Sequence, residues 1–561
     1  MSKYFFFLFV LLCSFDPKRT KMLLLNKIRK ITHFQIYVGL LIALAVSLPL
    51  SKALMSIFTG CLMLNWLVEG QFPLKLRQLK ERKSVLLLIS IFFVYLIGLL
   101  WTNSLQWGIH DLKIQLPLLI LPLVIGTSTS LNDRQVKHII YTFSAAVVVS
   151  SLCSIWVLLG FSGKTIQDPR ELSLFIWHIR FALLINISIF SMGWYLLNPE
   201  KKGFVEKTLL LLAMIWLSIF LVILKSATGW VVFLFVLAVV VCMGIFKIKK
   251  LIWRAAFLVL LVSIFLVPAV YIVRVVHQFY NIETLPASIS NEKTSRGNFY
   301  TNDFTNKQLE NGHYTFLFMN EEELREVWNK RSKINYDSTS ASGFDRYVLM
   351  RYLTSKGYRK DAEGLEKLTD EDIRNVENGM TNYLFQNSIS FYSRIYQIVW
   401  ETDVYRKGGN PSGHSVTQRL EYYKMAWSII KENPWFGCGT GGYYLAYQAK
   451  YDQNKFFQAH DFRQRSHNMF LSYWIDYGLI GLIYILIALV YPVFMERKTR
   501  SFLLMIFLLI VFLSFMNEDT LNNHDAITFF SFFYPLYLYN SLKPQSPIPN
   551  PSPKLGREFG Q

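Results

Sequence analysis

Three arginines and one histidine could carry chemistry in this sequence, because each one lies in an apolar run or in the polar stretch that leads into one. Arg180 lies two turns into such a run, in Trp177-His-Ile-Arg-Phe, roughly 10 Å from its start at about 1.5 Å per residue. A permanent charge is costly at that depth in a membrane. Arg180 therefore either extends to the lipid headgroups or faces a cavity that holds an anionic group.

The other three residues stand in one polar stretch near the C-terminal third of the chain. A predicted amphipathic helix carries Arg419, a glycine-rich loop follows, and Arg465 and His467 come just before an apolar helix. A histidine at such a junction is either a structural residue of the membrane interface or a functional group. The neighbours His460 and Asp461 lack the spacing of a zinc site, so the sequence predicts no metal there.

Two further segments are candidates for contact with a substrate. The loop containing Gly437 and Gly439 has neither the lysine of a phosphate-binding loop nor the context of a dinucleotide fingerprint. It is predicted to be a tight turn, and a backbone nest for phosphate is the alternative. Glu518 and Asp519 stand in a short turn before the last apolar run. There they could close a cavity rim, bind a sugar or face water.

The composition fixes the environment in which these residues lie. Of 561 residues, 52% are hydrophobic and 16% aromatic, with a mean hydropathy of +0.29 and a formal net charge of +20. These values exclude a disordered chain and an ordinary soluble enzyme, because one core could not hide so much apolar surface. The basic excess would indicate nucleic acid in a soluble protein, so the location of the charges decides its meaning.

Long apolar runs separated by short basic segments predict an all-α integral membrane protein. Twelve transmembrane helices are expected, of which the first two form a close pair that could instead be a re-entrant hairpin. The spans are predicted near 36–50, 52–68, 84–101, 112–127, 137–160, 174–196, 208–224, 228–246, 252–274, 468–494, 501–516 and 523–541. Residues 1–35 form a basic N-terminal segment, whose apolar run of 12 residues is too short to span. That run is either signal-like or an upstream extension before Met22.

The distribution of lysine and arginine predicts the orientation of the helices. With the N-terminus in the cytoplasm, the inside segments hold 26 basic residues and the short outside segments hold four. The transmembrane part then comprises 36–274 and 467–541, and the Pro-rich tail 542–561 is cytoplasmic and disordered. Residues 275–466 form a mainly helical periplasmic domain between the ninth and tenth spans. This domain has 24 basic and 23 acidic residues, so nearly all of the net charge lies outside it and faces anionic lipid rather than nucleic acid.

The polar stretch around His467 resembles the O-antigen ligase and polymerase superfamily of bacterial envelopes. The resemblance rests on an Arg-led helix, a Pro-x-x-Gly-x-Gly turn, a His-Asn pair at a helix start and an Asp-x-Gly further along. These elements are Arg419, Pro434 to Gly439, His467-Asn468 and Asp476 to Gly478. Arg180 in His-Ile-Arg-Phe is similar to the family's arginine in an earlier span, and residues 351–364 look like members from the Bacteroidetes type of envelope. The chain departs from the family at Lys225-Ser226, where many members carry Ser-Arg.

The resemblance implies an O-antigen ligase-like glycosyltransferase of the bacterial inner membrane whose site faces the periplasm. Its donor would be a glycan on undecaprenyl pyrophosphate, and its acceptor a sugar hydroxyl of the lipid A core. The resemblance makes His467 the general base and Arg180, Arg419 and Arg465 the ligands of the donor pyrophosphate. Further candidate positions are Gly437, Gly439, Asn468 and Glu518. Neither a metal nor another cofactor is implied, and Asp476 is expected to be structural.

Other functions share parts of this pattern. An O-antigen polymerase or a protein O-oligosaccharyltransferase would use the same lipid-linked donor with a different acceptor. A transporter of envelope glycolipids is the non-enzyme alternative. Transporters more often show internal repeats and charged residues near the membrane midplane, whereas the notable charges here are predicted at the outer face. The ligase interpretation is favoured because the large predicted loop carries the Arg and His elements.

Overall fold

A computed structural model describes residues 32–163, 169–198, 203–245, 248–285, 289–340, 343–386, 391–454, 457 and 463–540. The tail 542–561, most of segment 1–35, and the pair His460 and Asp461 lie outside these residues. The chain divides into two compact units. The first comprises Met1–Val236, Ser428–Ala446 and His467–Gln561, and the second comprises Leu237–Trp427 and Tyr447–Ser466.

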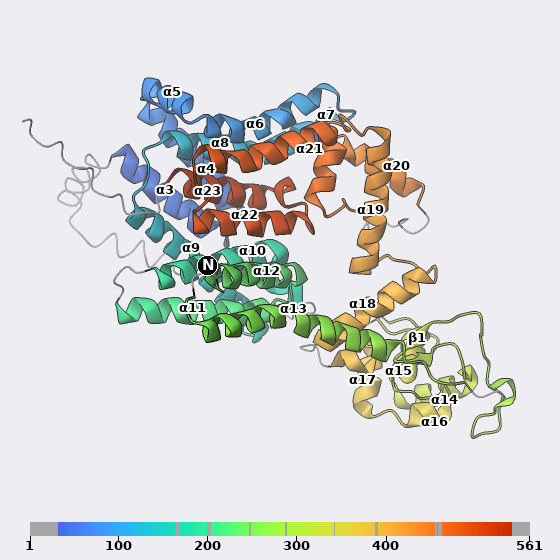
Figure 1. Ribbon diagram of the computed structural model, residues 1–561. Coiled ribbons are helices and arrows are strands. Elements are labelled where there is room, and N and C mark those ends of the chain that lie inside the picture. Colours follow the sequence, from blue (N-terminus) through green and yellow to red (C-terminus); the bar gives the residue numbers. More distant parts are fainter. Residues whose placement is uncertain are drawn as a thin grey trace, which may run out of the picture. The chain divides into compact units, whose positions relative to one another are not determined.

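The first unit is built from apolar helices. They are α3 (His33–Ser47), α4 (Lys52–Glu69), α5 (Phe72–Glu81), α6 (Lys83–Ile97), α7 (Leu105–Ile114), α8 (Leu116–Thr127), α9 (Asp133–Leu158), α10 (His178–Leu197), α11 (Phe204–Ile223), the start of α12 (Ala227–Ile245), α21 (Met469–Met495), α22 (Phe502–Phe515) and α23 (His524–Tyr539). The short helices η1 (Gly98–Leu100), η2 (Pro169–Leu172) and η6 (Thr520–Asn522) join them. In this unit α23 packs on α8, and both α8 and α21 pack on α6 (Figure 1).

Each of the twelve predicted spans contains a helix, but not every helix has the length of a span. Among the described residues, eight helices are long and apolar enough to cross a membrane, or nine if α4 and α5 form one broken span. The chain bends by 112° between α4 and α5. Helices α3, α22 and α23 have 15, 14 and 16 residues, which is short for a hydrocarbon core of about 30 Å. The count of twelve spans stays a prediction.

One end of the first unit gathers basic segments that are far apart in the sequence. Hydrogen bonds or ion pairs join Arg82 to the carbonyl of Gly126 (2.9 Å), Ser84 to Glu496 (2.5 Å), the N–H of Leu131 to Asn540 (2.6 Å) and Lys137 to Glu206 (2.8 Å). These residues belong to or adjoin the segments that the lysine and arginine count predicts to lie on the cytoplasmic side. The fold therefore places the predicted inside segments at one end of the first unit.

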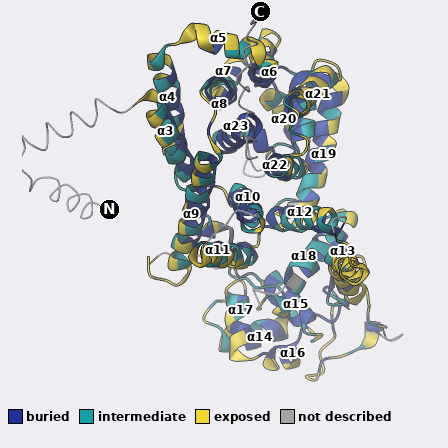
Figure 2. Ribbon diagram, turned by 60° about the vertical axis from the view of Figure 1, so that its left-hand side comes forward, coloured by how far each residue is buried: buried dark blue, intermediate teal, exposed yellow. Residues whose placement is uncertain are grey.

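The second unit combines an exposed apolar helix with a small polar domain. Helix α13 (Leu251–Phe279) is exposed over nearly its whole length, as the yellow ribbon in Figure 2 shows. The domain contains helices and one hairpin, whose strands β1 (Leu309–Glu310) and β2 (His313–Tyr314) have two residues each. The α-helices are α14 (Glu321–Arg331), α15 (Arg346–Ser355), α16 (Ala362–Glu366), α17 (Asp370–Glu377), α18 (Phe391–Arg406), α19 (Ser415–Glu432) and α20 (Tyr443–Asp452). Two short helices, η3 (Ile289–Asn291) and η4 (Tyr383–Gln386), also belong to the domain. Part of α19 and part of α20 belong to the first unit.

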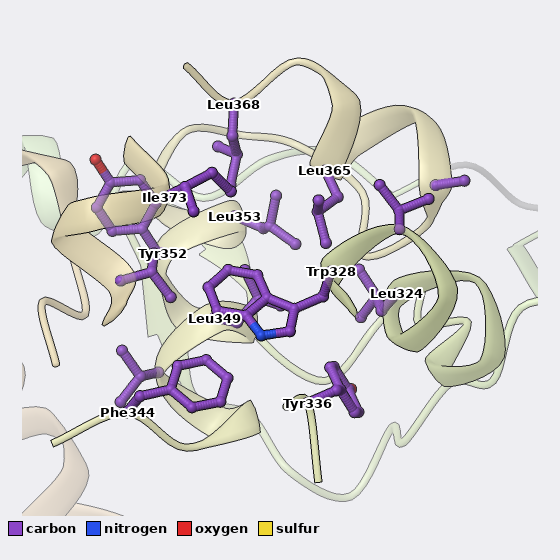
Figure 3. Close-up of a cluster of buried hydrophobic side chains, with 14 residues drawn as sticks. Leu324, Trp328, Tyr336, Phe344, Leu349, Tyr352, Leu353, Leu365, Leu368 and Ile373 are labelled. Carbon is purple, nitrogen blue, oxygen red and sulfur yellow. The ribbon is translucent and has the colours of Figure 1, made fainter. Parts of the chain in front are cut away.

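The domain has its own hydrophobic core around Trp328 (Figure 3). The Trp328 indole stacks on the Phe344 ring with a centroid distance of 4.7 Å, and its Nε1 donates a hydrogen bond to the carbonyl of Ile334. Leu349 and Leu353 of α15 lie in the same core, together with residues of α14, α16 and α17. A buried hydrophobic core of this kind stabilises the folded domain, and its charged surface is hydrated.

Candidate functional site

Arg180 lies in the first turn of α10 rather than two turns into a helix. The predicted span begins near 174, but Trp177 has an extended backbone (φ −64°, ψ 137°) and the helix starts only at His178. The Arg180 Nη1 atom lies 3.1 Å from Asp525 Oδ2, and only 17% and 5% of the two side chains are exposed. Arg180 therefore does face an anionic group, and this group is a carboxylate of the chain itself, that of Asp525.

A second cation approaches the same carboxylate. Lys52, the first residue of α4, places its Nζ atom 3.8 Å from Asp525 Oδ2. The neighbouring His524 contacts Ser56 of α4 through its Nε2 atom at 3.2 Å. A small pocket beside the Arg180–Asp525 pair has otherwise apolar walls, formed by Leu48, Ile176, Leu183, Leu184, Ala526 and Phe529. The apolar walls keep water from one side of the pair and thereby strengthen its electrostatic attraction.

His467 sits at the junction that precedes α21, in a backbone conformation that few residues adopt. Its φ is +51°, in the left-handed region. The conformation is held by the His467 N–H, which lies 3.2 Å from Asp519 Oδ2, and by Asn468, whose side chain caps the helix by accepting from the Leu471 N–H at 3.1 Å. Such conformations are frequent at functional sites, where the surrounding structure enforces them.

A carboxylate also lies beside the imidazole ring. His467 Nδ1 is 3.8 Å from Glu518 Oε1, with 25% and 12% of the two side chains exposed. The distance is longer than a hydrogen bond but short enough for electrostatic attraction. A carboxylate on the Nδ1 side favours the tautomer in which Nδ1 carries a proton, and this leaves Nε2 able to accept one.

One segment connects the residues around His467 with the Arg180–Asp525 pair. This segment, called the turn 516–525, runs from the end of α22 to the second residue of α23. Asp519 accepts from Ser472 Oγ at 2.6 Å as well as from His467, and Asp525 binds Arg180. Other helices fix the turn. Asn517 Nδ2 donates to Thr228 Oγ1 at 2.5 Å, Gln115 Nε2 donates to the Leu521 carbonyl at 2.9 Å, and Asn468 Nδ2 donates to the Met516 carbonyl at 3.3 Å. The fold thus gathers the starts of α4, α10, α12, α21 and α23 at the end of the first unit that is predicted to face outward.

The glycine loop is a packed junction against a break in α21. At Gly478 the helix has φ +66° and ψ −174°, so its hydrogen-bond ladder is interrupted. The loop supplies the missing partners: the N–H groups of Cys438 and Gly439 donate to the carbonyls of Ile475 and Asp476, both at 2.8 Å. In return, the Leu479 N–H donates to the Pro434 carbonyl at 2.8 Å.

Both predicted glycine positions are required by this packing. Gly437 and Gly439 have φ of +68° and +78°. A Cβ on Gly437 would lie 2.5 Å from the Ile475 oxygen, and one on Gly439 would lie 2.6 Å from the Gly98 oxygen. Since the N–H groups of Gly437, Cys438, Gly439 and Thr440 all donate within the protein, the geometry is that of a tight turn and not of a phosphate nest.

Arg419 and Arg465 belong to the second unit. Arg419 is the fifth residue of α19 and is half-buried. Arg465 is half-buried in a non-helical segment whose neighbours are held firmly. The Gln464 N–H donates to the Tyr451 hydroxyl at 2.9 Å, and Arg463 Nη1 donates to Asp452 Oδ1 at 2.8 Å. Arg419 thus lies on a helix of its unit, and Arg465 lies in a segment whose neighbours are hydrogen-bonded.

Residues 379–486 match the family model of O-antigen ligase. This match supports membership of the O-antigen ligase superfamily. The matched segment contains Arg419, Gly437, Gly439, Arg465 and His467, so the resemblance of this stretch is confirmed. No curated protein matches the chain at a significant level.

The O-antigen ligase match indicates the coarse chemistry. The apolar helices and the match together support a multi-pass membrane protein, and the matched family consists of glycosyltransferase-like membrane enzymes that act on lipid-linked glycans. Within the described residues, no group of three or more His, Cys, Asp or Glu side chains is placed to hold a metal ion.

Sequence reasoning missed two residues of the candidate site, which lie outside the matched segment. Asp525 and Lys52 were not identified as candidates, because each stands near the edge of an apolar run, where charged residues are common. A signal was present, however. Asp525 lies just inside the last predicted span, 523–541, where a cationic partner would stabilise an acidic residue. Which cation it meets depends on helix packing.

Proposed function

We propose that the chain is an O-antigen ligase that transfers a glycan from undecaprenyl pyrophosphate to a sugar hydroxyl of the lipid A core, at the periplasmic face of the bacterial inner membrane. The observation that carries this proposal is the connection between His467, inside the O-antigen ligase match, and Arg180, outside it, through the turn 516–525. One segment thus forms hydrogen bonds with both a candidate base and a candidate phosphate ligand. The transfer reaction needs both groups.

The residues suit the transfer reaction. The acceptor hydroxyl attacks the anomeric carbon of the donor, the bond from that carbon to the pyrophosphate oxygen breaks, and undecaprenyl pyrophosphate leaves. Negative charge grows on the phosphate oxygens, where permanently charged guanidinium groups stabilise it. We assign this role to Arg180, Arg419 and Arg465. His467 accepts the proton of the attacking hydroxyl, and Glu518 orients the imidazole and stabilises its charged form.

The proposed orientation has twelve spans, with both termini in the cytoplasm and residues 275–466 in the periplasm. It is supported by the way the first unit sorts its helix ends. The basic segments meet at one end, and Arg180, His467 and the turn 516–525 meet at the other. Lysine and arginine are retained on the cytoplasmic side of bacterial membranes, so the second end is the periplasmic one.

The function is tested by glycolipid analysis of a bacterial strain that lacks this gene. The expected defect leaves long polymer on the carrier lipid and none on lipid A. The wild-type gene should restore the polymer on lipid A, and His467→Ala should not. His138→Ala is the matched control, because His138 is an exposed histidine of α9.

Other patterns would identify other functions. Lipid A capped by a single repeat unit would identify a polymerase, and loss of sugar from proteins alone would identify a protein O-oligosaccharyltransferase. A strain with unchanged glycolipids and glycoproteins would refute the assignment to this pathway. Restoration by His467→Ala would refute the assignment of the base.

A further inference from the structure

Lys52, Arg180 and Asp525 form a charged group in which two cations share one carboxylate oxygen. Arg180 Nη1 lies 3.1 Å and Lys52 Nζ lies 3.8 Å from Asp525 Oδ2. The three side chains together carry one positive charge in excess. The exposure of the cations differs: 17% of the Arg180 side chain is exposed, whereas 56% of the Lys52 side chain is exposed. The group therefore has a fixed, buried cation and an accessible one.

The backbone around this group adds to its positive potential. Lys52 is the first residue of α4, Arg180 is the third residue of α10, and Asp525 is the second residue of α23. These three helices begin at one place, and the N-terminus of a helix carries a partial positive charge from its aligned peptide dipoles. One carboxylate does not balance two cations and three helix starts. The group is able to attract a further anion.

We propose that Lys52 and Arg180 together bind one phosphate group of the lipid-linked donor, with Asp525 holding the two cations in position. This inference rests on the proposed function and adds Lys52 as a binding residue and Asp525 as a positioning residue. The planar guanidinium of Arg180 offers two parallel N–H donors to phosphate oxygens, and the Lys52 ammonium adds a compact charge on a flexible stem. Without the Asp525 carboxylate the two cations would repel each other and separate.

The proposal predicts a specific loss of donor affinity in Lys52→Gln. A charge-assisted contact to phosphate of this kind is expected to raise the Kd for undecaprenyl pyrophosphate and the KM for the glycan donor about 10- to 100-fold. The kcat is expected to change less than threefold, because Lys52 does not take part in proton transfer. Lys52→Arg should restore affinity to within a few-fold. Lys113→Gln is the matched control, since Lys113 is an exposed lysine of α7.

The binding measurement uses the purified full chain in lipid nanodiscs with undecaprenyl pyrophosphate as the probe. A second measurement needs no variant: bound probe should protect Lys52, and not Lys113, from acetylation of the wild-type protein, as read by mass spectrometry. This keeps the proposal testable if Lys52→Gln does not fold. The expected results are weaker binding by Lys52→Gln and selective protection of Lys52.

Two outcomes would overturn the proposal, and they are distinguishable from each other. If the wild type binds the probe and transfers glycan, but Lys52→Gln does so with unchanged KM and Lys52 is acetylated equally with and without probe, the role of Lys52 is wrong and the proposed function stands. If the wild type neither binds undecaprenyl pyrophosphate nor transfers glycan, the proposed function fails and the phosphate site fails with it.

Discussion

Replacing Gly478 with alanine is expected to open the junction between α21 and the glycine loop. Gly478 combines φ +66° with ψ −174°, a region of backbone space that is essentially restricted to glycine. A Cβ built at this position would lie 2.1 Å from both the carbonyl carbon and the oxygen of Trp435. Real Cβ atoms do not approach backbone atoms to within 3.0 Å, so the loop or the helix has to move.

The magnitude follows from two separate costs. The backbone conformation costs about 1–3 kcal/mol for a residue with a side chain. Overlap with a packed neighbour that cannot move freely costs about 1–3 kcal/mol more. The free energy of unfolding should therefore fall by about 4 kcal/mol. Gly60→Ala is the matched control, because Gly60 lies within α4 with nothing within 4 Å of a new Cβ. Alanine should stabilise that helix by about 1 kcal/mol.

Cys438 provides a local assay for the opened junction. Burial raises the pKa of the Cys438 thiol from 9.0 to about 12, and the nearby carboxylates of Asp476 and Glu432 act in the same direction. At pH 8 the thiolate fraction is then about 1,000-fold below that of an ordinary thiol, so Cys438 should react slowly with maleimide.

In Gly478→Ala, peptide-resolved mass spectrometry should show at least about a 10-fold faster reaction of Cys438, since an exposed thiol regains its ordinary pKa. The thermal unfolding midpoint should fall as well. Equal labelling rates and equal midpoints in Gly478→Ala and Gly60→Ala would refute the argument.

Three further outcomes follow from the site and the polar domain. Glu518→Gln should lower kcat about 10-fold, less than the loss of about 100-fold or more expected for His467→Ala, and equal losses in an in vitro transfer assay would contradict an orienting role. Burial lowers the pKa of Lys360 from 10.5 to about 7, so between these pH values the unfolded chain binds the extra proton and stability rises with pH, by up to about 5 kcal/mol. Lys360→Met should remove this part of the pH dependence of thermal unfolding, and a slope identical to wild type between pH 7 and 9.5 would disprove it. Because the proposed site uses Arg180 and Lys52 rather than a metal ion to stabilise phosphate charge, glycan transfer should persist in excess EDTA, and loss of activity restored by a divalent cation would show that metal is needed.

Local features of the fold could be predicted from the sequence because they depend on neighbouring residues. The Asn311–Gly312 pair predicts a turn, and it joins β1 to β2 with both residues at positive φ. The acidic run from Glu321 predicts a helix, and α14 begins there with Asn320 as its cap. The acidic run 361–378 predicts one continuous helix, and this prediction is wrong. Thr369 caps a new helix instead, so α16 and α17 are separate.

The sequence by itself indicated the class of protein and the candidate residues for its chemistry. Apolar runs and the distribution of lysine and arginine depend only on composition along the chain, and the motif around His467 lies within one stretch that matches O-antigen ligase. The start of α10 was misplaced because apolar residues before His178 look the same whether helical or extended.

Only the tertiary structure decided which charges meet. Arg180 and Asp525 are 345 residues apart, and His467 and Asp519 are 52 apart, so no local pattern could pair them. The pairing results from helix packing, which brings the starts of α4, α10, α21 and α23 to one end of the first unit. The same packing places the glycine loop against the break in α21, where its N–H groups donate to carbonyl groups of the helix. A break in α21 leaves carbonyl groups that must find donors, and the nearest N–H groups belong to that loop.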